Sequence, residues 1–391
     1  MRCAGVYTSF LLGVVLTSSC VGSIEDPAFE DGVLEDGAVR DGGAQPRGPS
    51  DAGADARSTP AGATDARVPY AGRDAAGPPV SSGGSASSYR VVDGLLYDGC
   101  GEQVVLRGVN HPTIFVDRAG QAMPEIARTH ANVVRLFWFA NGGVAITEAE
   151  AAIEAAVANG MVPMLELHDS TCAWDLGPIL DYWTSSDAIA LIKRHEQHLL
   201  INIANEPKPP DAASFSHGYS DAVVRMRTAG IHVPLVIDGG NCGRDYQMLL
   251  DNGLDLLAQD PDHNLIFSAH LYDPLSASQI GKIFDQANNA QLPLIVGEFA
   301  NHQPPGCGAS IDYKSVISEA QRANIGWLAW SWGDNDPDTS WNTDCADFDM
   351  TSTFSFETLQ GWGKEVAVSH ADSIQNTAVR PYALTHGDMC K

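Results

Sequence analysis

The segment LLINIANEP, residues 199–207, places an aliphatic run directly before Asn205, Glu206 and Pro207. A short apolar run that ends at a proline predicts a buried β-strand followed by a turn. In a barrel of parallel strands the carboxyl ends converge on one face, where the reacting groups lie. A carboxylate at such a strand end is therefore a candidate functional group.

Similar apolar runs recur along the chain at intervals of roughly thirty residues, the length of a strand, a crossover helix and two loops. They cover residues 104–109, 132–137, 161–167, 199–203, 234–238, 264–270, 293–299 and 326–332. Helix-like segments lie between them, such as ITEAEAAIEAAVANG at 146–160, which ends at a glycine. Continuous apolar strands indicate burial on both faces of a parallel sheet. The pattern predicts an α/β fold, a single (β/α)8 TIM barrel.

The turn after the first predicted strand, RGVNHPT at 107–113, contains no G-x-G-x-x-G motif. An open sheet that binds a dinucleotide usually carries this motif there, so the sequence argues against that class of protein.

The first 88 residues differ from the rest. Residues 1–20 combine one arginine, a short apolar stretch and small residues before Cys20, which predicts an export signal peptide. Cys20 could also be the lipidated residue of a bacterial lipoprotein, and both secretion and a lipid tether stay open here. Residues 21–88 are acidic and rich in Ala, Gly, Pro and Ser, which predicts a disordered linker. Residues 89–391 form the predicted catalytic domain, which we expect to act outside the cytoplasm as a monomer.

The charge balance is strongly acidic, with 49 Asp and Glu against 23 Lys and Arg. A surface of this sign repels phosphate-rich partners, so we expect no nucleic acid ligand. The segment HEQH at 195–198 lacks the histidine spacing of a zincin helix, and no two cysteines form a C-x-x-C pair. The sequence therefore predicts neither a metal nor an organic cofactor.

Beyond Cys3 and Cys20 the chain has six cysteines, an even number that predicts disulfides in an exported protein. Positions on a barrel suggest three bridges, although six cysteines allow about fifteen pairings. The expected pairs are Cys172–Cys242, Cys307–Cys345 and Cys100–Cys390.

Polar side chains collect at the carboxyl ends of the predicted strands. They are Asn110, His111, Arg135, His168, Asp169, Asn205, Glu206, Asp238, His270, Tyr272, Glu298, Trp330 and Trp332. Two glutamates, Glu206 and Glu298, follow the fourth and seventh strands, and such a pair can flank a glycosidic bond. Each residue alone has a structural alternative: Glu206 could cap a helix, Arg135 could form a structural ion pair and His168 could be a core histidine.

The quoted strand ends resemble glycoside hydrolase family 5, and within it the bacterial β-mannanase branch. The matching segments are RGVNHPT, NVVRLFW, MLELHDST, INIANEP, IFSAHLYD, IVGEFANHQ and WLAWSWGDN, within residues 104–335. The resemblance implies a retaining double displacement in which Glu206 is the general acid/base and Glu298 is the nucleophile. It implies an endo-acting enzyme on β-1,4-linked mannan or glucomannan.

The resemblance also implies supporting roles for neighbouring residues. Asn205 would bind the sugar 2-hydroxyl, and Arg135 and Tyr272 would keep the pKa of Glu298 low. His168 and His270 would orient Glu206 and the substrate, with His111 as a further supporting residue. Trp330 would stack under the sugar. Trp332, two residues further along the strand, would lie on the same face of the strand as Trp330.

Two departures leave alternatives open. Cys242 stands where β-mannanases often carry a tryptophan, and Lys208 follows the Asn-Glu-Pro motif in place of an aromatic residue or glycine. The alternatives are a β-1,4-glucanase of the same family and a barrel that binds glycans without cleaving them.

Overall fold

The structure, a computed structural model, describes residues 88–140, 142–303, 307–333 and 349–390. The predicted export signal, Cys20 and all but the last residue of the predicted linker lie outside these ranges. In the described ranges, no helix has both the length and the apolar character needed to span a bilayer.

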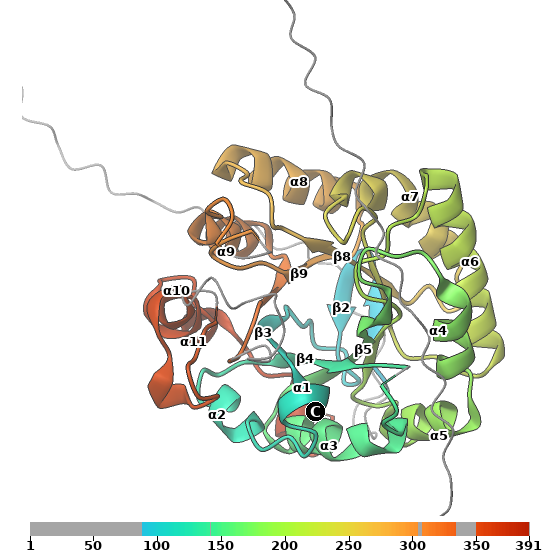
Figure 1. Cartoon of the computed structure of the whole chain (residues 1–391), viewed down its shortest axis with the longest axis horizontal. Helices are drawn as coiled ribbons and strands as arrows, with labels where there is room; N and C mark the ends of the chain where they lie inside the picture. Colours follow the sequence, from blue (N-terminus) through green and yellow to red (C-terminus); the bar gives the residue numbers. More distant parts are fainter. Residues whose placement is uncertain (1–87, 141, 304–306, 334–348, 391) are drawn as a thin grey trace, which may run out of the picture. The chain divides into compact units, whose positions relative to one another are not determined.

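A closed barrel of parallel strands forms the centre of the described chain (Figure 1). Its strands pair in the order β10-β3-β4-β5-β6-β7-β8-β9 and are almost entirely buried. Their bounds are β3 Arg107–His111, β4 Val133–Trp138, β5 Val162–Leu167, β6 Leu200–Asn202, β7 Leu235–Asp238, β8 Leu265–His270, β9 Leu294–Glu298 and β10 Gly326–Ala329. The eight predicted strands and the TIM barrel are confirmed, with shorter and slightly shifted strand limits.

Helices surround the barrel (Figure 1). The longer ones are α3 Glu150–Ala158, α4 Leu176–Trp183, α5 Ser186–His195, α6 Ala212–Thr228, α7 Tyr246–Gln259, α8 Ala277–Ala290 and α9 Tyr313–Ala323. Short helical elements are α1 Thr113–Val116, α2 Met123–Ala127, η1 Ile146–Ala149, η2 His168–Ser170, η3 Phe356–Thr358, α10 Gly361–Lys364, η4 Glu365–Ser369, α11 Ile374–Thr377 and α12 Tyr382–Thr385. Several longer helices begin at an aspartate that accepts a backbone N–H of the first turn, as Asp211 does for α6 and Asp312 for α9.

A two-stranded hairpin precedes the barrel, formed by β1 Arg90–Val92 and β2 Leu95–Tyr97. Asp93 and Gly94 join the strands with φ of 50° and 79°, the backbone that a two-residue Asp-Gly turn adopts. The sequence analysis missed this hairpin, although the Asp-Gly pair between apolar residues was its signal.

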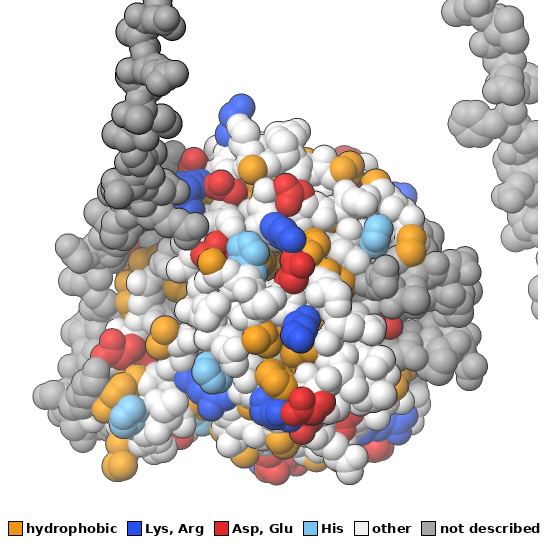
Figure 2. Space-filling model, turned by 90° about the vertical axis from the view of Figure 1, so that its left-hand side faces the viewer, with side chains coloured by type: hydrophobic (Ala, Val, Ile, Leu, Met, Phe, Trp, Pro, Cys, Tyr) orange, Lys and Arg blue, Asp and Glu red, His pale blue; other side chains and the backbone are white. Residues whose placement is uncertain are grey.

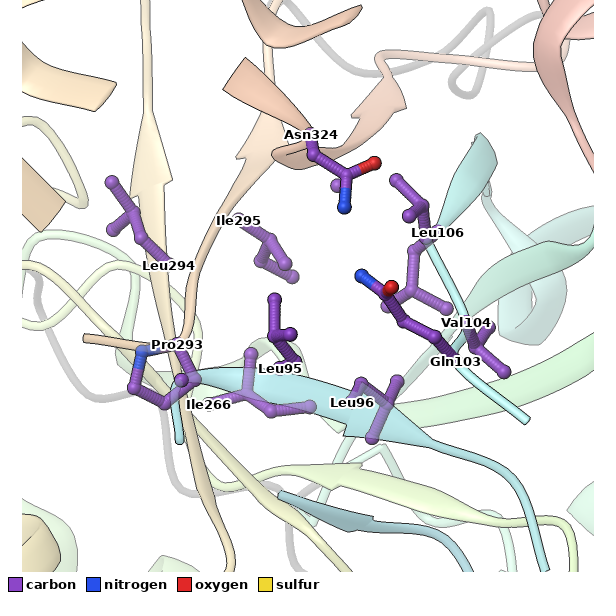
Figure 3. Close-up of a pocket in the computed structure, with 13 residues that line it drawn as sticks. Leu95, Leu96, Gln103, Val104, Leu106, Ile266, Pro293, Leu294, Ile295 and Asn324 are labelled. Carbon is purple, nitrogen blue, oxygen red and sulfur yellow. The ribbon is translucent and has the colours of Figure 1, made fainter. Parts of the chain in front are cut away.

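The hairpin lies against the amino end of the barrel. The Asn264 side chain, before β8, accepts the Val91 N–H at 3.0 Å and donates to the Tyr89 carbonyl at 3.2 Å. A small pocket there is lined mainly by apolar side chains such as Leu95, Ile266 and Ile295 (Figure 3). The polar strand-end residues therefore lie at the opposite, carboxyl end of the barrel.

Two disulfides match the predicted pairs. Cys100–Cys390 joins the segment after the hairpin to the end of the described chain, and Cys172–Cys242 joins two loops at the carboxyl end of the barrel. Both predictions are confirmed. The third predicted pair includes Cys345, which lies outside the described residues.

The outer face shown in Figure 2 carries basic and acidic side chains interspersed with small apolar areas. Ion pairs such as Arg322–Glu319 on α9 link an exposed side chain to a half-buried one of opposite sign. Pairs of this kind contribute little to stability, about 0–1 kcal/mol each.

Candidate active site

The two glutamates meet at the carboxyl end of the barrel. Glu206 lies just beyond β6 and Glu298 ends β9. A carboxylate oxygen of each, together with a ring nitrogen of His270, lies within 4.8 Å of the others. Retaining glycosidases hold their carboxyl groups about 5–5.5 Å apart, whereas inverting enzymes need roughly 6.5–9.5 Å to admit a water. The separation of these Glu206 and Glu298 oxygens is shorter than an inverting pair needs and fits a retaining pair.

Glu298 is buried and accepts strong hydrogen bonds on both oxygens. Arg135 Nη1 donates to Oε1 at 2.6 Å, and the Tyr272 hydroxyl donates to Oε2 at 3.0 Å. Other donors of the Arg135 guanidinium are held by the side-chain oxygens of Asn110, Asn202 and Asn205 at 3.0, 2.8 and 2.7 Å. These contacts fix the guanidinium beside the carboxylate, as the resemblance implied.

Glu206 is held differently. Its backbone has a φ of 47°, in the left-handed region, and its N–H donates to Asp238 Oδ2 at 3.1 Å. Its Oε1 lies 2.9 Å from His270 Nδ1. The side chain is 14% exposed, whereas that of Glu298 is 3% exposed. Glu206 therefore faces the open side of the pair.

Two buried carboxylates complete the site: Glu166, which the sequence analysis did not single out, and Asp238, which it placed at a strand end without a role. Glu166 Oε1 lies 2.8 Å from His168 Nδ1, and Asp238 Oδ2 forms an ion pair with His270 Nε2 at 3.3 Å. Arg135 Nη2 lies between them, 3.8 Å from Glu166 and 3.6 Å from Asp238. Their signal in the sequence was an acidic residue within or at the end of an apolar strand.

The network keeps its inner groups charged. Burial alone would lower the pKa of His270, but Glu298 and Asp238 outweigh burial and raise this pKa to about 10. Burial alone would raise the pKa of Asp238, but His270 and Arg135 lower this pKa to about 2. At neutral pH the His270 imidazolium thus carries an N–H toward both Asp238 and Glu206.

The pKa of Glu298 corrects an expectation from the sequence. Burial raises this pKa to about 7, against the lowering effect of His270 and Arg135, and the nearby charge of Glu206 adds to the rise. The expected low pKa follows from the cation and the phenol, whereas the loss of hydration at a position that is only 2% exposed outweighs both.

Aromatic rings line one side of the site. Trp330, just beyond β10, stacks on Phe137 at 4.8 Å between ring centroids and on His168 at 5.8 Å. Trp330 is half-buried and keeps an accessible surface.

The predicted position of Trp332 is wrong. The strand β10 ends at Ala329, so the alternation of a strand does not continue to this residue. Trp332 is fully buried, and its Nε1 donates to the Phe354 carbonyl at 2.9 Å. His111 is also fully buried and lies 3.0 Å from Asp117 through Nε2, which leaves it a supporting position only.

The described residues contain two groups whose donor atoms are close enough to hold a metal ion. One is Glu206, His270 and Glu298, and the other is Glu150, Glu154 and His195 on the outer surface. In the first group Arg135 and His270 already contact the oxygens of Glu298 and Glu206, which disfavours a further cation.

The comparisons with known proteins agree with this geometry. The sequence profile described as Cellulase (glycosyl hydrolase family 5) matches residues 97–336. The chain belongs to glycoside hydrolase family 5. Family 5 relatives include mannan endo-1,4-beta-mannosidases from Cellvibrio japonicus strain Ueda107 and Salipaludibacillus agaradhaerens. The first is 32% identical, covering 79% of this chain and 72% of the relative, and the second is 33% identical, covering 73% and 93%.

Solved structures of β-mannanases superpose on this barrel. The β-mannanase from Thermomonospora fusca has a TM-score of 0.69 and 30% identity, and the match covers 76% of this chain and all of that one. Its complexes with mannotriose and mannohexaose match with a TM-score of 0.68.

Proposed function

We propose that this family 5 glycoside hydrolase is an endo-β-1,4-mannanase that cleaves mannan and glucomannan with retention of configuration. The observation that carries the reaction type is the Glu206–Glu298 pair at retaining distance, with Arg135 and Tyr272 bound to one member. The choice of mannan as the substrate is supported by the relatives, three of which are named mannan endo-1,4-beta-mannosidases.

In the first step the Glu298 carboxylate attacks the anomeric carbon of the sugar. The bond from that carbon to the glycosidic oxygen breaks as Glu206 gives this oxygen a proton, and the leaving chain departs as an alcohol. Arg135 and Tyr272 donate hydrogen bonds to the Glu298 carboxylate, which is the form that attacks. His270 Nδ1, 2.9 Å away, orients the Glu206 carboxyl group.

In the second step Glu206 acts as a base. Glu298 is now a neutral ester, so the negative charge that held the proton on Glu206 is gone and the Glu206 carboxylate persists. It takes a proton from a water whose oxygen bonds to the anomeric carbon, and Glu298 leaves as a carboxylate. Two inversions give net retention.

Other residues would bind the sugar. Trp330 offers an aromatic face against which a pyranose ring can stack, braced from behind by Phe137. Asn205 Nδ2, which donates to Thr171 Oγ1 at 2.8 Å, would exchange this partner for the sugar 2-hydroxyl.

Reducing-sugar release by the full chain from mannan, glucomannan and carboxymethylcellulose tests the function. We expect release from both mannans, with a mixture of short oligosaccharides that marks internal cleavage. Preferred release from carboxymethylcellulose would favour the β-1,4-glucanase alternative. Binding to mannan without any release would favour the glycan-binding barrel.

The pH dependence follows from the pKa of the buried Glu298, which is raised to about 7. Below this value Glu298 becomes protonated, and a protonated carboxyl group cannot attack the anomeric carbon. We therefore expect kcat/KM on mannopentaose to fall about tenfold per pH unit below pH 7. A profile that stays flat from pH 5 to pH 8 would contradict this assignment.

We also propose that the enzyme works as a monomer outside the cytoplasm. Disulfides persist in oxidising compartments, so Cys100–Cys390 and Cys172–Cys242 support export. Secretion and a membrane tether through Cys20 stay alternatives. Mass spectrometry of the mature amino terminus in the native host distinguishes them, because only a lipoprotein begins with acylated Cys20.

A further inference from the structure

The Cys172–Cys242 disulfide connects two loops that lie on either side of the Glu206 peptide. Cys172 lies between η2 and α4, and Cys242 lies between β7 and α7. Their Cα atoms are 4.6 Å apart although 70 residues separate them in the sequence. Glu206 lies inside this covalent loop.

The first loop runs beside the segment that carries Glu206 and bonds it at successive residues. The hydrogen bonds are Ser170 Oγ to the Asn205 carbonyl at 2.6 Å, Cys172 N to the Glu206 carbonyl at 2.9 Å and Lys208 N to the Ala173 carbonyl at 2.8 Å. The peptide of Glu206 is thus fixed on this side by the cysteine itself.

The second loop holds the other side of the same segment. Cys242 N donates to the Pro207 carbonyl at 3.2 Å. The next residue, Gly243, packs on the imidazole of His270 so closely that an added Cβ would lie 2.6 Å from Nδ1. The Gly243 carbonyl also accepts the backbone N–H of His270 at 2.9 Å. This loop therefore fixes both the backbone beside Glu206 and the imidazole that orients its carboxyl group.

The backbone conformations at the two cysteines and at Glu206 must be held in place by the surrounding structure. Cys172, Glu206 and Cys242 have φ of 55°, 47° and 59°, in the left-handed region that side-chain-bearing residues rarely adopt. Cys172 and its neighbour Ala173 are exposed, so water competes for the hydrogen bonds of the first loop. A covalent link between the loops resists this opening.

We propose that the Cys172–Cys242 disulfide is a positioning device for the general acid/base: it clamps the Glu206–Pro207 peptide between two loops and so sets the reach of the Glu206 carboxyl group. The inference rests on the proposed role of Glu206. It assigns this disulfide a part in proton transfer, beyond stabilising the rim of the barrel.

The test compares two substrates that differ in their need for an acid. Cleavage of mannopentaose requires a proton on the departing sugar, whereas 2,4-dinitrophenyl β-mannobioside loses a phenolate that needs none. In C172S/C242S we expect kcat/KM on mannopentaose to fall about ten- to hundredfold, because a displacement of about 1 Å is costly for positioned catalysis. For the aryl mannoside, kcat/KM reports the first step alone and should stay within about twofold.

The matched control is C100S/C390S, which opens the other described disulfide, far from Glu206. We expect it to lower Tm while the ratio of the two kcat/KM values stays that of the wild type. If C172S/C242S does not fold, mild reduction of the wild-type enzyme gives the same comparison. Two electrons and two protons from dithiothreitol convert the Cys172–Cys242 bridge, which is exposed at Cys172, to two thiols, which alkylation and peptide mapping identify.

The outcomes separate the two claims. A wild type inactive on both mannosides would refute the proposed function. If the wild type is active but opening Cys172–Cys242 leaves the ratio of the two kcat/KM values unchanged, including when both values fall equally, the clamp alone is refuted.

Discussion

Glu298→Ala is expected to lower kcat/KM on mannopentaose by about 10⁵-fold, because the variant has no group to form the covalent glycosyl-enzyme. Steady-state hydrolysis with reducing-sugar detection measures the loss. Arg135 keeps its contacts to Asn110, Asn202 and Asn205 in the variant, so the barrel should remain folded.

Azide distinguishes loss of the nucleophile from general damage. In Glu298→Ala the small anion can enter the space of the lost carboxylate and attack the anomeric carbon of 2,4-dinitrophenyl β-mannobioside from that face. The product is then the α-glycosyl azide, of inverted configuration, which NMR identifies. Glu319→Ala, on the outer helix α9, is the control and should keep wild-type activity. Wild-type-like hydrolysis by Glu298→Ala would remove this residue from the mechanism.

Glu206→Ala is expected to affect substrates unequally. Cleavage of mannopentaose should fall about 10²–10⁴-fold, the usual contribution of a general acid. The first step on 2,4-dinitrophenyl β-mannobioside should proceed almost normally, since the leaving phenolate needs no proton. The second step then lacks its base, so a burst of dinitrophenolate followed by slow turnover is expected in stopped-flow measurements.

Here azide should act on the other face of the sugar. It replaces the water that Glu206 would have activated and attacks the glycosyl-enzyme, so the product is the β-glycosyl azide, with retained configuration. Opposite azide anomers from the two alanine variants would assign the two roles separately. The same anomer from both variants would contradict the assignment of acid/base and nucleophile.

Much of the site could be predicted because its signals are local. Each apolar run fixes the position of a strand, and the polar residue that ends the run must then lie at the carboxyl end of the barrel. This rule brought Arg135, Glu206 and Glu298 together from positions up to 163 residues apart. Pairing of Cys172 with Cys242 followed in the same way from the order of the loops.

Other features depend on what surrounds a residue in three dimensions. Glu166 lies within an apolar run and Asp238 ends one, and only the fold shows that they contact the rings of His168 and His270. The alternation that placed Trp332 beside Trp330 fails because the strand ends at Ala329.

By itself the sequence predicted the barrel and the place of Glu206 and Glu298 at its carboxyl end, since apolar periodicity and strand-end residues are local features of the chain. Its resemblance to a known family predicted the class of reaction. The tertiary structure alone decided the pKa of Glu298 and the clamp around Glu206. The pKa follows from burial among charges contributed by distant strands, and the clamp follows from the distance between two loops. Neither burial nor through-space distance is a property of a short stretch of sequence.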